Sequence, residues 1–257
     1  MKINIRYFLT NRAMGHRDDE SLDEFFQGRL KVIQKMKGYR FSLDPILLCH
    51  FVAPGKGKRV LDLGTGCGII PLILARRDES LRITGVEIQE ELADLARRNV
   101  RSNGLSERID IIQGDLKRID RVLEKGSFDL VLSNPPFRRP DSGRINPSSQ
   151  KAIARHEVLV SLEDVVRCGR EFMAPKGRLA LIYPAYRAVD LFLGLRRERL
   201  EPKRFRAVHS HLRSPAKMVL VEARKGGGKE LEFLPPLVLY EDSGEYTIEM
   251  KEIYMSG

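Results

Sequence analysis

The sequence predicts an α/β fold in which a mostly parallel sheet is covered by helices on both faces. Two observations indicate this fold. From Arg59 onward, short apolar runs typical of buried strands alternate with segments of helical periodicity. The length of 257 residues, 42% of them hydrophobic, suits one such domain with a short appendage and a sizeable core.

The expected elements follow one another in a regular order. The strands are expected at residues 59–64, 82–88, 109–115, 127–134, 178–184, 205–211 and 217–224. The helices are expected at residues 69–77, 91–104, 162–177 and 185–200. Because no helix separates the last two strands, they should pair antiparallel at the edge of the sheet.

The segments on either side of this core are shorter. Residues 1–24 are polar and predict a flexible lead-in, and residues 30–34 and 39–42 are strand-like. Asp44 is expected to cap a helix that has Pro45 in its first turn. We therefore divide the remaining chain, 25–257, into an N-terminal cofactor-closing segment (25–56), a core (57–224) and a C-terminal appendage (225–257) that follows a glycine-rich break.

Several classes of protein are excluded by composition. No apolar run approaches the ~18 residues that a membrane span needs, and the N-terminal residues lack the features of a secretory signal. Cys49, Cys67 and Cys168 lie far apart with no partnering histidine cluster, so neither a disulfide framework nor a metal site is expected. The sequence therefore predicts a soluble, cytoplasmic protein.

The net charge of +10 is concentrated in one stretch of the chain. Residues 134–229 contain 21 Lys plus Arg and 9 Asp plus Glu, whereas the rest contains 24 and 26. A basic excess of this kind favours contact with a polyphosphate backbone, although it also occurs on ordinary solvated helices.

A glycine-rich loop follows the first core strand. The segment Asp62–Gly68 reads DLGTGCG, and Glu87 ends the next strand 19 residues after Gly68. Glycines at a strand-to-helix turn let a ligand approach the main chain, and a carboxylate at the end of the second strand can accept both ribose hydroxyls. The sequence therefore predicts a nucleoside cofactor held by Asp62, Gly64, Thr65, Gly66, Gly68 and Glu87.

The fourth strand ends in Asn134-Pro135-Pro136-Phe137. Two consecutive prolines force the chain out of the sheet, and the Pro135 carbonyl and the Asn134 amide oxygen then offer two acceptors. Two acceptors can hold both hydrogens of one exocyclic amine, and Phe137 can stack on the base that carries it. Asn134, Pro135 and Phe137 are therefore the candidate catalytic residues.

The loop and the turn together carry a family resemblance. The spacing GxGxG with Asp62 resembles the first motif of class I S-adenosylmethionine-dependent methyltransferases, and NPPF resembles their amino-group branch. The resemblance implies a Rossmann-like, seven-stranded sheet of order 3-2-1-4-5-7-6 with an antiparallel edge strand. It also implies that Asp115 and Leu116, in IIQGDL, contact the adenine of S-adenosylmethionine and that Asn134 borders this cofactor.

From about Leu22 to the C-terminus, the sequence resembles the bacterial tRNA-Val adenine-N6 methyltransferases. It rests on QGRLKVIQKMKGYRFSLDPILL, on ARHE and on PPLVLYEDSGEYTIEMKEIY. It implies that Phe41, Ser42 and Asp44 close over the cofactor, with Arg40 as a possible substrate contact. The candidate RNA contacts are Arg138, Arg139, Arg155, His156, Lys203, Arg204 and Arg206.

Alternatives remain at this stage. Guanine N2 in ribosomal RNA, adenine N6 in DNA and a protein glutamine amide are other targets of the amino-group branch. A nicotinamide-dependent oxidoreductase could use the glycine loop and Glu87, but it has no use for NPPF. A nucleic-acid-binding module without catalysis is the third class, and the oligomeric state stays open.

Overall fold

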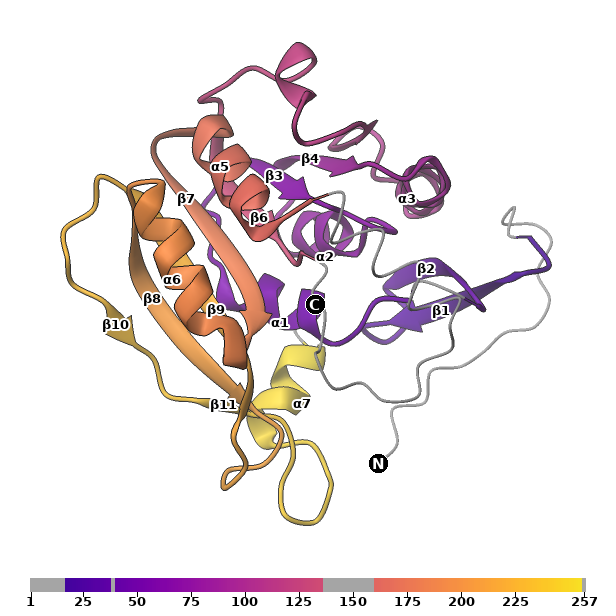
Figure 1. Ribbon diagram of the computed structural model, residues 1–257. Coiled ribbons are helices and arrows are strands. Elements are labelled where there is room, and N and C mark those ends of the chain that lie inside the picture. The colour runs from indigo at the N-terminus through magenta and orange to yellow at the C-terminus, as the bar shows by residue number, and fades with distance from the viewer. Residues whose placement is uncertain (1–16, 38–39, 136–159, 256–257) are drawn as a thin grey trace.

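The computed structural model describes residues 17–37, 40–135 and 160–255, and shows one large sheet between layers of helices (Figure 1). The strands of this sheet are β3 Arg59–Leu63, β4 Arg82–Glu87, β5 Ile109–Gln113, β6 Phe128–Ser133, β7 Met173–Pro184, β8 Leu200–His209, β9 Ala216–Lys225, β10 Glu232–Phe233 and β11 Leu237–Val238. Their spatial order is β10-β8-β9-β7-β6-β3-β4-β5, and β11 also pairs with β8.

The seven longer strands reproduce the expected order, because β5, β4, β3, β6, β7, β9 and β8 correspond to 3-2-1-4-5-7-6. The expected antiparallel pairing of the last two long strands, β8 and β9, is confirmed. Strand β9 lies one position in from the edge, between β7 and β8, and runs antiparallel to both. The outer edge is β8, which the short C-terminal strands β10 and β11 partly cover.

Helices cover both faces of the sheet (Figure 1). They are α1 Asp44–Phe51, α2 Ile69–Arg77, α3 Glu90–Ser102, α5 Leu162–Phe172, α6 Ala188–Arg197 and α7 Ile248–Met255, with 3-10 turns at Ile119–Arg121 and Ala185–Arg187. Alternate strand residues point to opposite faces, so Val60 packs in the core with α1, α2, α3 and α7, and Leu61 packs in the core with α5 and α6.

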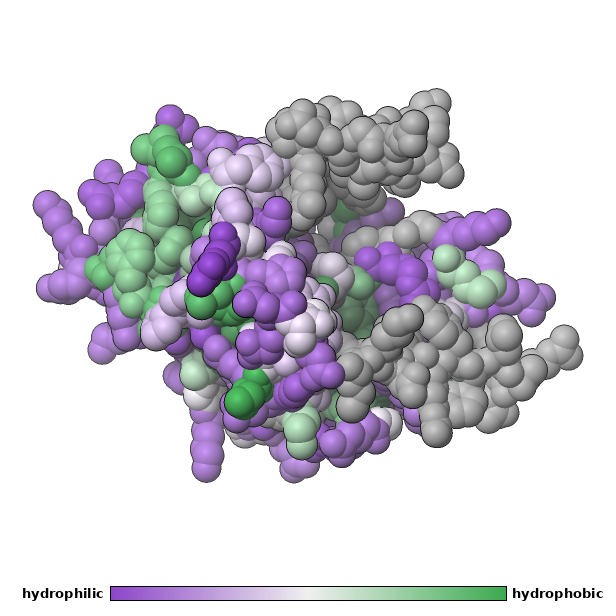
Figure 2. Space-filling view, turned by 90° about the horizontal axis from the view of Figure 1, so that it is seen from below, coloured by the Kyte–Doolittle hydropathy of each residue, from purple (hydrophilic) through white to green (hydrophobic). Residues whose placement is uncertain are grey.

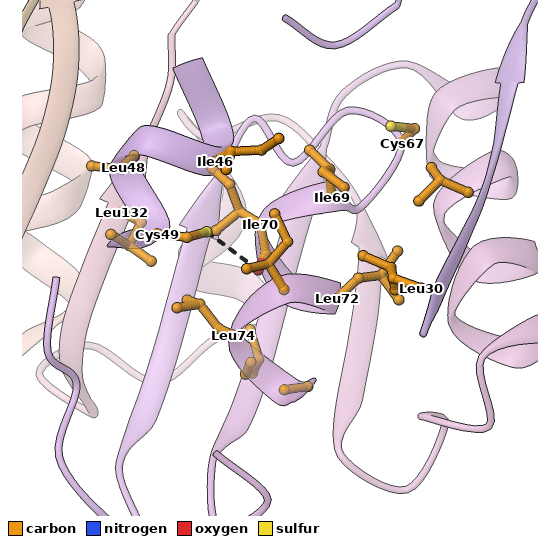
Figure 3. Close-up of a cluster of buried hydrophobic side chains, with 14 of the residues drawn as sticks. Leu30, Ile46, Leu48, Cys49, Cys67, Ile69, Ile70, Leu72, Leu74 and Leu132 are labelled. Atoms are coloured by element: carbon orange, nitrogen blue, oxygen red, sulfur yellow. Dashed lines mark hydrogen bonds between the residues drawn. The ribbon is translucent and has the colours of Figure 1, made fainter. Parts of the chain in front are cut away.

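The core on the first face is apolar and closely filled. Figure 3 shows Ile46, Leu48 and Cys49 of α1 beside side chains of α2, with the Cys49 thiol directed at the Ile70 carbonyl. All three cysteines are free and buried. This packing fixes α2, and with it the glycine loop that leads into α2.

Strand β7 starts earlier than expected. Helix α5 ends at Phe172, and the segment up to Gly177, predicted as helix, already runs beside β6. Phe128 pairs with Met173 but Leu130 pairs with Arg178, so the extra residues form a bulge in which Lys176 has a φ of 76°. Proline and glycine mark this bulge rather than the helix end.

The N-terminal segment forms a hairpin of β1 Glu20–Phe25 and β2 Leu30–Lys35. The expected lead-in therefore contains a strand, and residues 40–42 are not a strand. The pairing partner of β2 is β1. The polar composition of residues 20–24 does not indicate a strand. Helix α1 begins one residue earlier than expected, with Leu43 at the N-cap position and Asp44 inside the helix.

The surface is mainly hydrophilic, with a gathering of hydrophobic side chains on the side where α6, β8 and β10 lie (Figure 2). Val189, Leu193 and Phe233 are the large exposed apolar residues of these elements. In the described ranges no helix is long and apolar enough to cross a membrane.

Candidate active site

Four neighbouring strands bring the predicted cofactor and catalytic residues to one edge of the sheet. The glycine loop follows β3, Glu87 ends β4, Asp115 follows β5, and Asn134 follows β6. These strands are parallel and adjacent in the order β6-β3-β4-β5, so their carboxyl ends meet at the same edge. The fold therefore brings together residues that are up to 72 positions apart in the sequence.

The glycine loop is held by main-chain hydrogen bonds to the end of β4. The amides of Gly64 and Thr65 both donate to the carbonyl of Val86 at 2.9 Å, and the amide of Gly66 donates to Oε2 of Glu87 at 2.9 Å. Gly64, Gly66 and Gly68 have φ values of 77°, 57° and 84°, which L side chains rarely adopt. The loop is thus a rigid turn with its backbone available at the sheet edge.

Two buried polar groups in this loop region have no partner. Both carboxylate oxygens of Asp62 and the hydroxyl of Thr65 make no hydrogen bond with any described residue, although the two residues are 0% and 3% exposed. Burial raises the pKa of Asp62 to about 7 against a smaller opposing effect of the nearby Thr65 hydroxyl, and the negative charge of Glu87 adds to the increase. Unpaired buried acceptors are costly unless a ligand satisfies them, so the loop fits a cofactor with cationic and hydroxyl groups.

The acidic residues of the next two strands differ in their surroundings. Glu87 is 5% exposed, and its second oxygen, Oε1, accepts a hydrogen bond of 3.0 Å from the amide of Gln89. Asp115 is partly exposed and accepts a 2.9 Å bond from the amide of Lys117, as a turn aspartate does. The next residue, Leu116, is buried.

The turn after β6 is anchored to the strand beside it. The Ser133 hydroxyl is fully buried and donates to the carbonyl of Leu63 at 2.7 Å, which joins the ends of β6 and β3. Pro135 is buried and Asn134 is partly exposed. The predicted residues Phe137, Arg138, Arg139, Arg155 and His156 lie outside the described part of the chain.

The predicted closing segment is held by the N-terminal hairpin. The amide of Phe41 donates to Oε1 of Gln34 at 3.1 Å, and its ring lies 5.1 Å from that of Phe25. The Ser42 hydroxyl donates to Oδ2 of Asp44 at 2.7 Å. Arg40 pairs with the buried carboxylate of Asp23 at 2.5 Å. Arg40 thus serves the hairpin, and the cofactor contacts of Phe41, Ser42 and Asp44 stay predictions.

The three described RNA-contact candidates on β8 already have partners from elsewhere in the chain. Lys203 donates to the Gly228 carbonyl at 3.0 Å, and Arg204 lies over the Phe51 ring, 4.8 Å from its centroid. Arg206 forms an ion pair of 2.7 Å with Glu249 of α7. These contacts tie β8 to α1 and to the C-terminal segment, and the RNA role of the three residues stays a prediction.

Two residues of this region do not follow from the motifs. Ser133 is a polar residue at the end of a strand whose other inward positions are apolar. Asn99 falls on the apolar face of α3, together with Leu92, Ala96 and Val100. A polar residue on an otherwise buried stripe is the sequence signal that could have indicated both.

The fold and the loop define a class I methyltransferase that depends on S-adenosylmethionine, and comparison with known proteins agrees. The family model "Methyltransferase small domain" matches residues 44–183. A curated protein of Porphyromonas gingivalis named tRNA1(Val) (adenine(37)-N6)-methyltransferase is 35% identical over 88% of this chain and 91% of its own length. One of the same name from Parabacteroides distasonis is 32% identical over 84% and 91%.

Solved structures support the same class. An Agrobacterium tumefaciens protein, described as a predicted O-methyltransferase, has a TM-score of 0.69 and 25% identity, covering 83% of this chain and 96% of its own. An S-adenosylmethionine-dependent methyltransferase from Aquifex aeolicus, at 18% identity, shares the fold with a TM-score of 0.52, covering 70% and 89%. The chain belongs to the methyltransferase small-domain family, so the oxidoreductase alternative falls away.

Proposed function

We propose that this methyltransferase transfers a methyl group to N6 of an adenine in tRNA. The observation that carries the proposal is the position of Asn134 and Pro135 directly after Ser133. The hydroxyl of Ser133 is hydrogen-bonded to the end of β3, the strand that leads into the glycine loop. The pairing of β6 with β3, the strand that carries the buried carboxylate of Asp62, supports a shared site for the turn and the glycine loop at one sheet edge. The names of the curated relatives support adenine N6 and tRNA.

Each residue has a separate task in the proposed reaction. When bound, S-adenosylmethionine supplies an electrophilic methyl group. The glycine loop supports the methionine and ribose parts of the cofactor, and Asp62 faces the positive charge of the methionine part. Glu87 accepts hydrogen bonds from the ribose hydroxyls. Asp115 and Leu116 contact the adenine ring. Together they fix the direction from which a nucleophile must approach.

The NPPF turn positions the substrate amine. The amide oxygen of Asn134 and the carbonyl of Pro135 accept the two N–H groups of the exocyclic nitrogen, which turns its lone pair out of conjugation with the ring. Phe137 stacks on the base. A strong base is unnecessary because the nitrogen loses its proton after the new bond has formed.

The basic residues would hold the RNA around this base. An adenine in a single-stranded loop can be splayed into the pocket while arginines contact the flanking phosphates. Arg138, Arg139, Arg155 and His156 follow the turn in the sequence and are the first candidates for this contact. A substrate of this kind places the enzyme in the cytoplasm.

A transfer assay tests the proposal. The full chain is incubated with tritiated S-adenosylmethionine and, separately, with unmodified total tRNA, rRNA and DNA, and the labelled nucleoside is identified after digestion. We expect label in N6-methyladenosine from tRNA, and the Asn134→Ala variant as the control should give none. Label in methylguanosine, or only in rRNA or DNA, would refute the proposed target.

A further inference from the structure

Asn99 is a fully buried polar residue in the last turn of α3. Its neighbours on the same face of the helix are apolar and belong to the core. A buried amide requires partners for its oxygen and its two N–H groups. The question is therefore which groups Asn99 satisfies.

Asn99 binds the hairpin and the glycine loop at the same time. Its Oδ1 accepts a 2.7 Å hydrogen bond from the amide of Ile33 in β2, and its Nδ2 donates to the carbonyl of Ile33 at 3.0 Å. The same Nδ2 donates to the carbonyl of Cys67, in the glycine loop, at 3.0 Å. One side chain thus pairs with a strand as a peptide group would and also ties that strand to the loop.

The connection continues from β2 to the predicted closing segment. Gln34, next to Ile33, is 3% exposed, and its Oε1 accepts from the amide of Phe41. Its Nε2 donates at 2.5 Å to Oδ2 of Asp23, the oxygen that also receives Arg40. A continuous path therefore runs from Cys67 through Asn99, Ile33 and Gln34, all buried, to the partly exposed Phe41.

Asn103, one helical turn after Asn99, makes similar contacts and can be compared with it. Asn103 repeats the pairing on Lys31, accepting from its amide at 3.1 Å and donating to its carbonyl at 2.6 Å. Its third bond goes to the carbonyl of Asn99 on the same helix, not to the glycine loop. Asn103 thus attaches α3 to the hairpin without touching the loop.

We propose that Asn99 is a positioning residue for S-adenosylmethionine, which sets the placement of the glycine loop relative to the segment Phe41–Asp44. The proposal rests on the proposed cofactor role of these two segments. Without the amide, the Cys67 carbonyl and both main-chain groups of Ile33 lose their side-chain partner, and each unpaired buried group is costly. The loop would then relax, because its glycines tolerate many conformations.

The test compares Asn99→Ala with Asn103→Ala by titration with S-adenosylhomocysteine, at a temperature where both variants are folded. We expect the Kd to rise about tenfold for Asn99→Ala and to change less than about twofold for Asn103→Ala, which corresponds to losing one buried hydrogen bond at the loop. In the transfer assay, the KM for the cofactor should rise for Asn99→Ala while the KM for RNA stays constant. Equal changes of Kd in both variants, or no change in either, would overturn the proposal.

A second variant covers the case in which Asn99→Ala does not fold. Gln34→Met cuts the same path on the hairpin side and leaves the glycine loop untouched, so a several-fold rise in Kd is expected. Wild-type affinity in Gln34→Met would overturn the proposal as well. A wild-type protein that binds no S-adenosylhomocysteine would contradict the proposed function itself, whereas normal wild-type binding with unaffected variants refutes the role of Asn99 alone.

Discussion

The backbone amide of Gly66 donates a 2.9 Å hydrogen bond to the buried carboxylate of Glu87, which joins the glycine loop to the end of β4. The other oxygen of Glu87 receives the amide of Gln89 at the start of α3. Glu87 therefore shapes the loop through contacts that exist without any cofactor. A residue expected from the motif to bind ribose has a structural task as well.

The first prediction concerns this dual role. Glu87→Ala should weaken binding of S-adenosylhomocysteine by at least about tenfold and lower the free energy of unfolding by about 1–3 kcal/mol, because the loop amide of Gly66 and the amide of Gln89 lose their acceptor. Calorimetric titration and denaturant unfolding measure the two effects. Glu87→Gln keeps one acceptor oxygen and should lie between Ala and wild type; if it binds as weakly as Glu87→Ala, charge rather than loop geometry is decisive.

The second prediction separates chemistry from binding. Asn134→Ala should reduce the rate of methyl transfer by about 100-fold or more, because an acceptor that orients the amine is lost. The Kd for S-adenosylhomocysteine should change little, since the loop residues are untouched. Single-turnover transfer and calorimetry measure both quantities. Turnover near the wild-type rate would refute the amino-group mechanism.

The third prediction concerns pH and Asp62, whose pKa in the folded protein is raised to about 7 by burial. Since the unfolded carboxyl ionises near pH 4, the folded state binds the extra proton between these values, and stability should fall as pH rises from about 4 to 7. A cationic cofactor prefers the ionised form, so its affinity should instead rise over about pH 6 to 8, with release of a proton.

Calorimetry in buffers of different ionisation enthalpy detects that proton. The Asp62→Asn variant is the control, because it cannot ionise and should bind the cofactor weakly and with a flat pH profile. A wild-type profile as flat as that of the variant would show that Asp62 does not titrate with binding.

The fourth prediction compares two glycines. A Cβ at Gly85 of β4 would lie 2.8 Å from Oγ1 of Thr65 and 2.9 Å from Cδ1 of Ile111, so Gly85→Ala should displace Thr65 and cost about 1–3 kcal/mol of stability. A Cβ at Gly194 of α6 meets nothing within 4 Å, so Gly194→Ala should stabilise by about 0.5–1 kcal/mol. Thermal unfolding measures both, and destabilisation by Gly194→Ala would contradict the packing described for α6.

Much of the core could be predicted because its signals are local. The strand Arg59–Leu63 and the helix Ile69–Arg77 appear as apolar runs with a glycine loop between them, and the structure has both. The motif order along the chain also predicts which strand ends share the active-site edge. These features need only the period of the hydrophobic residues and the rules of parallel sheets.

Other features depend on contacts between distant residues and could not be predicted. The strand Glu20–Phe25 has a polar sequence because Glu20 pairs with Arg98 of α3 at 2.6 Å and Asp23 with Arg40, partners that no local pattern reveals. Likewise, Pro175 and Gly177 interrupt a helix pattern, but whether they end a helix or form a bulge depends on β6. The role of Asn99 needs both the hairpin and the loop.

The guanidinium of Arg29, in the turn of the N-terminal hairpin, donates to the main-chain carbonyl of Met255 at the end of α7 at 2.7 Å. The first and the last described elements of the chain are thus direct neighbours, although all strands of the large sheet lie between them in the sequence. During synthesis, the hairpin emerges from the ribosome long before the helix that accepts this hydrogen bond. Its attachment to this helix must therefore wait until α7 has been synthesised, and until then the hairpin lacks this contact.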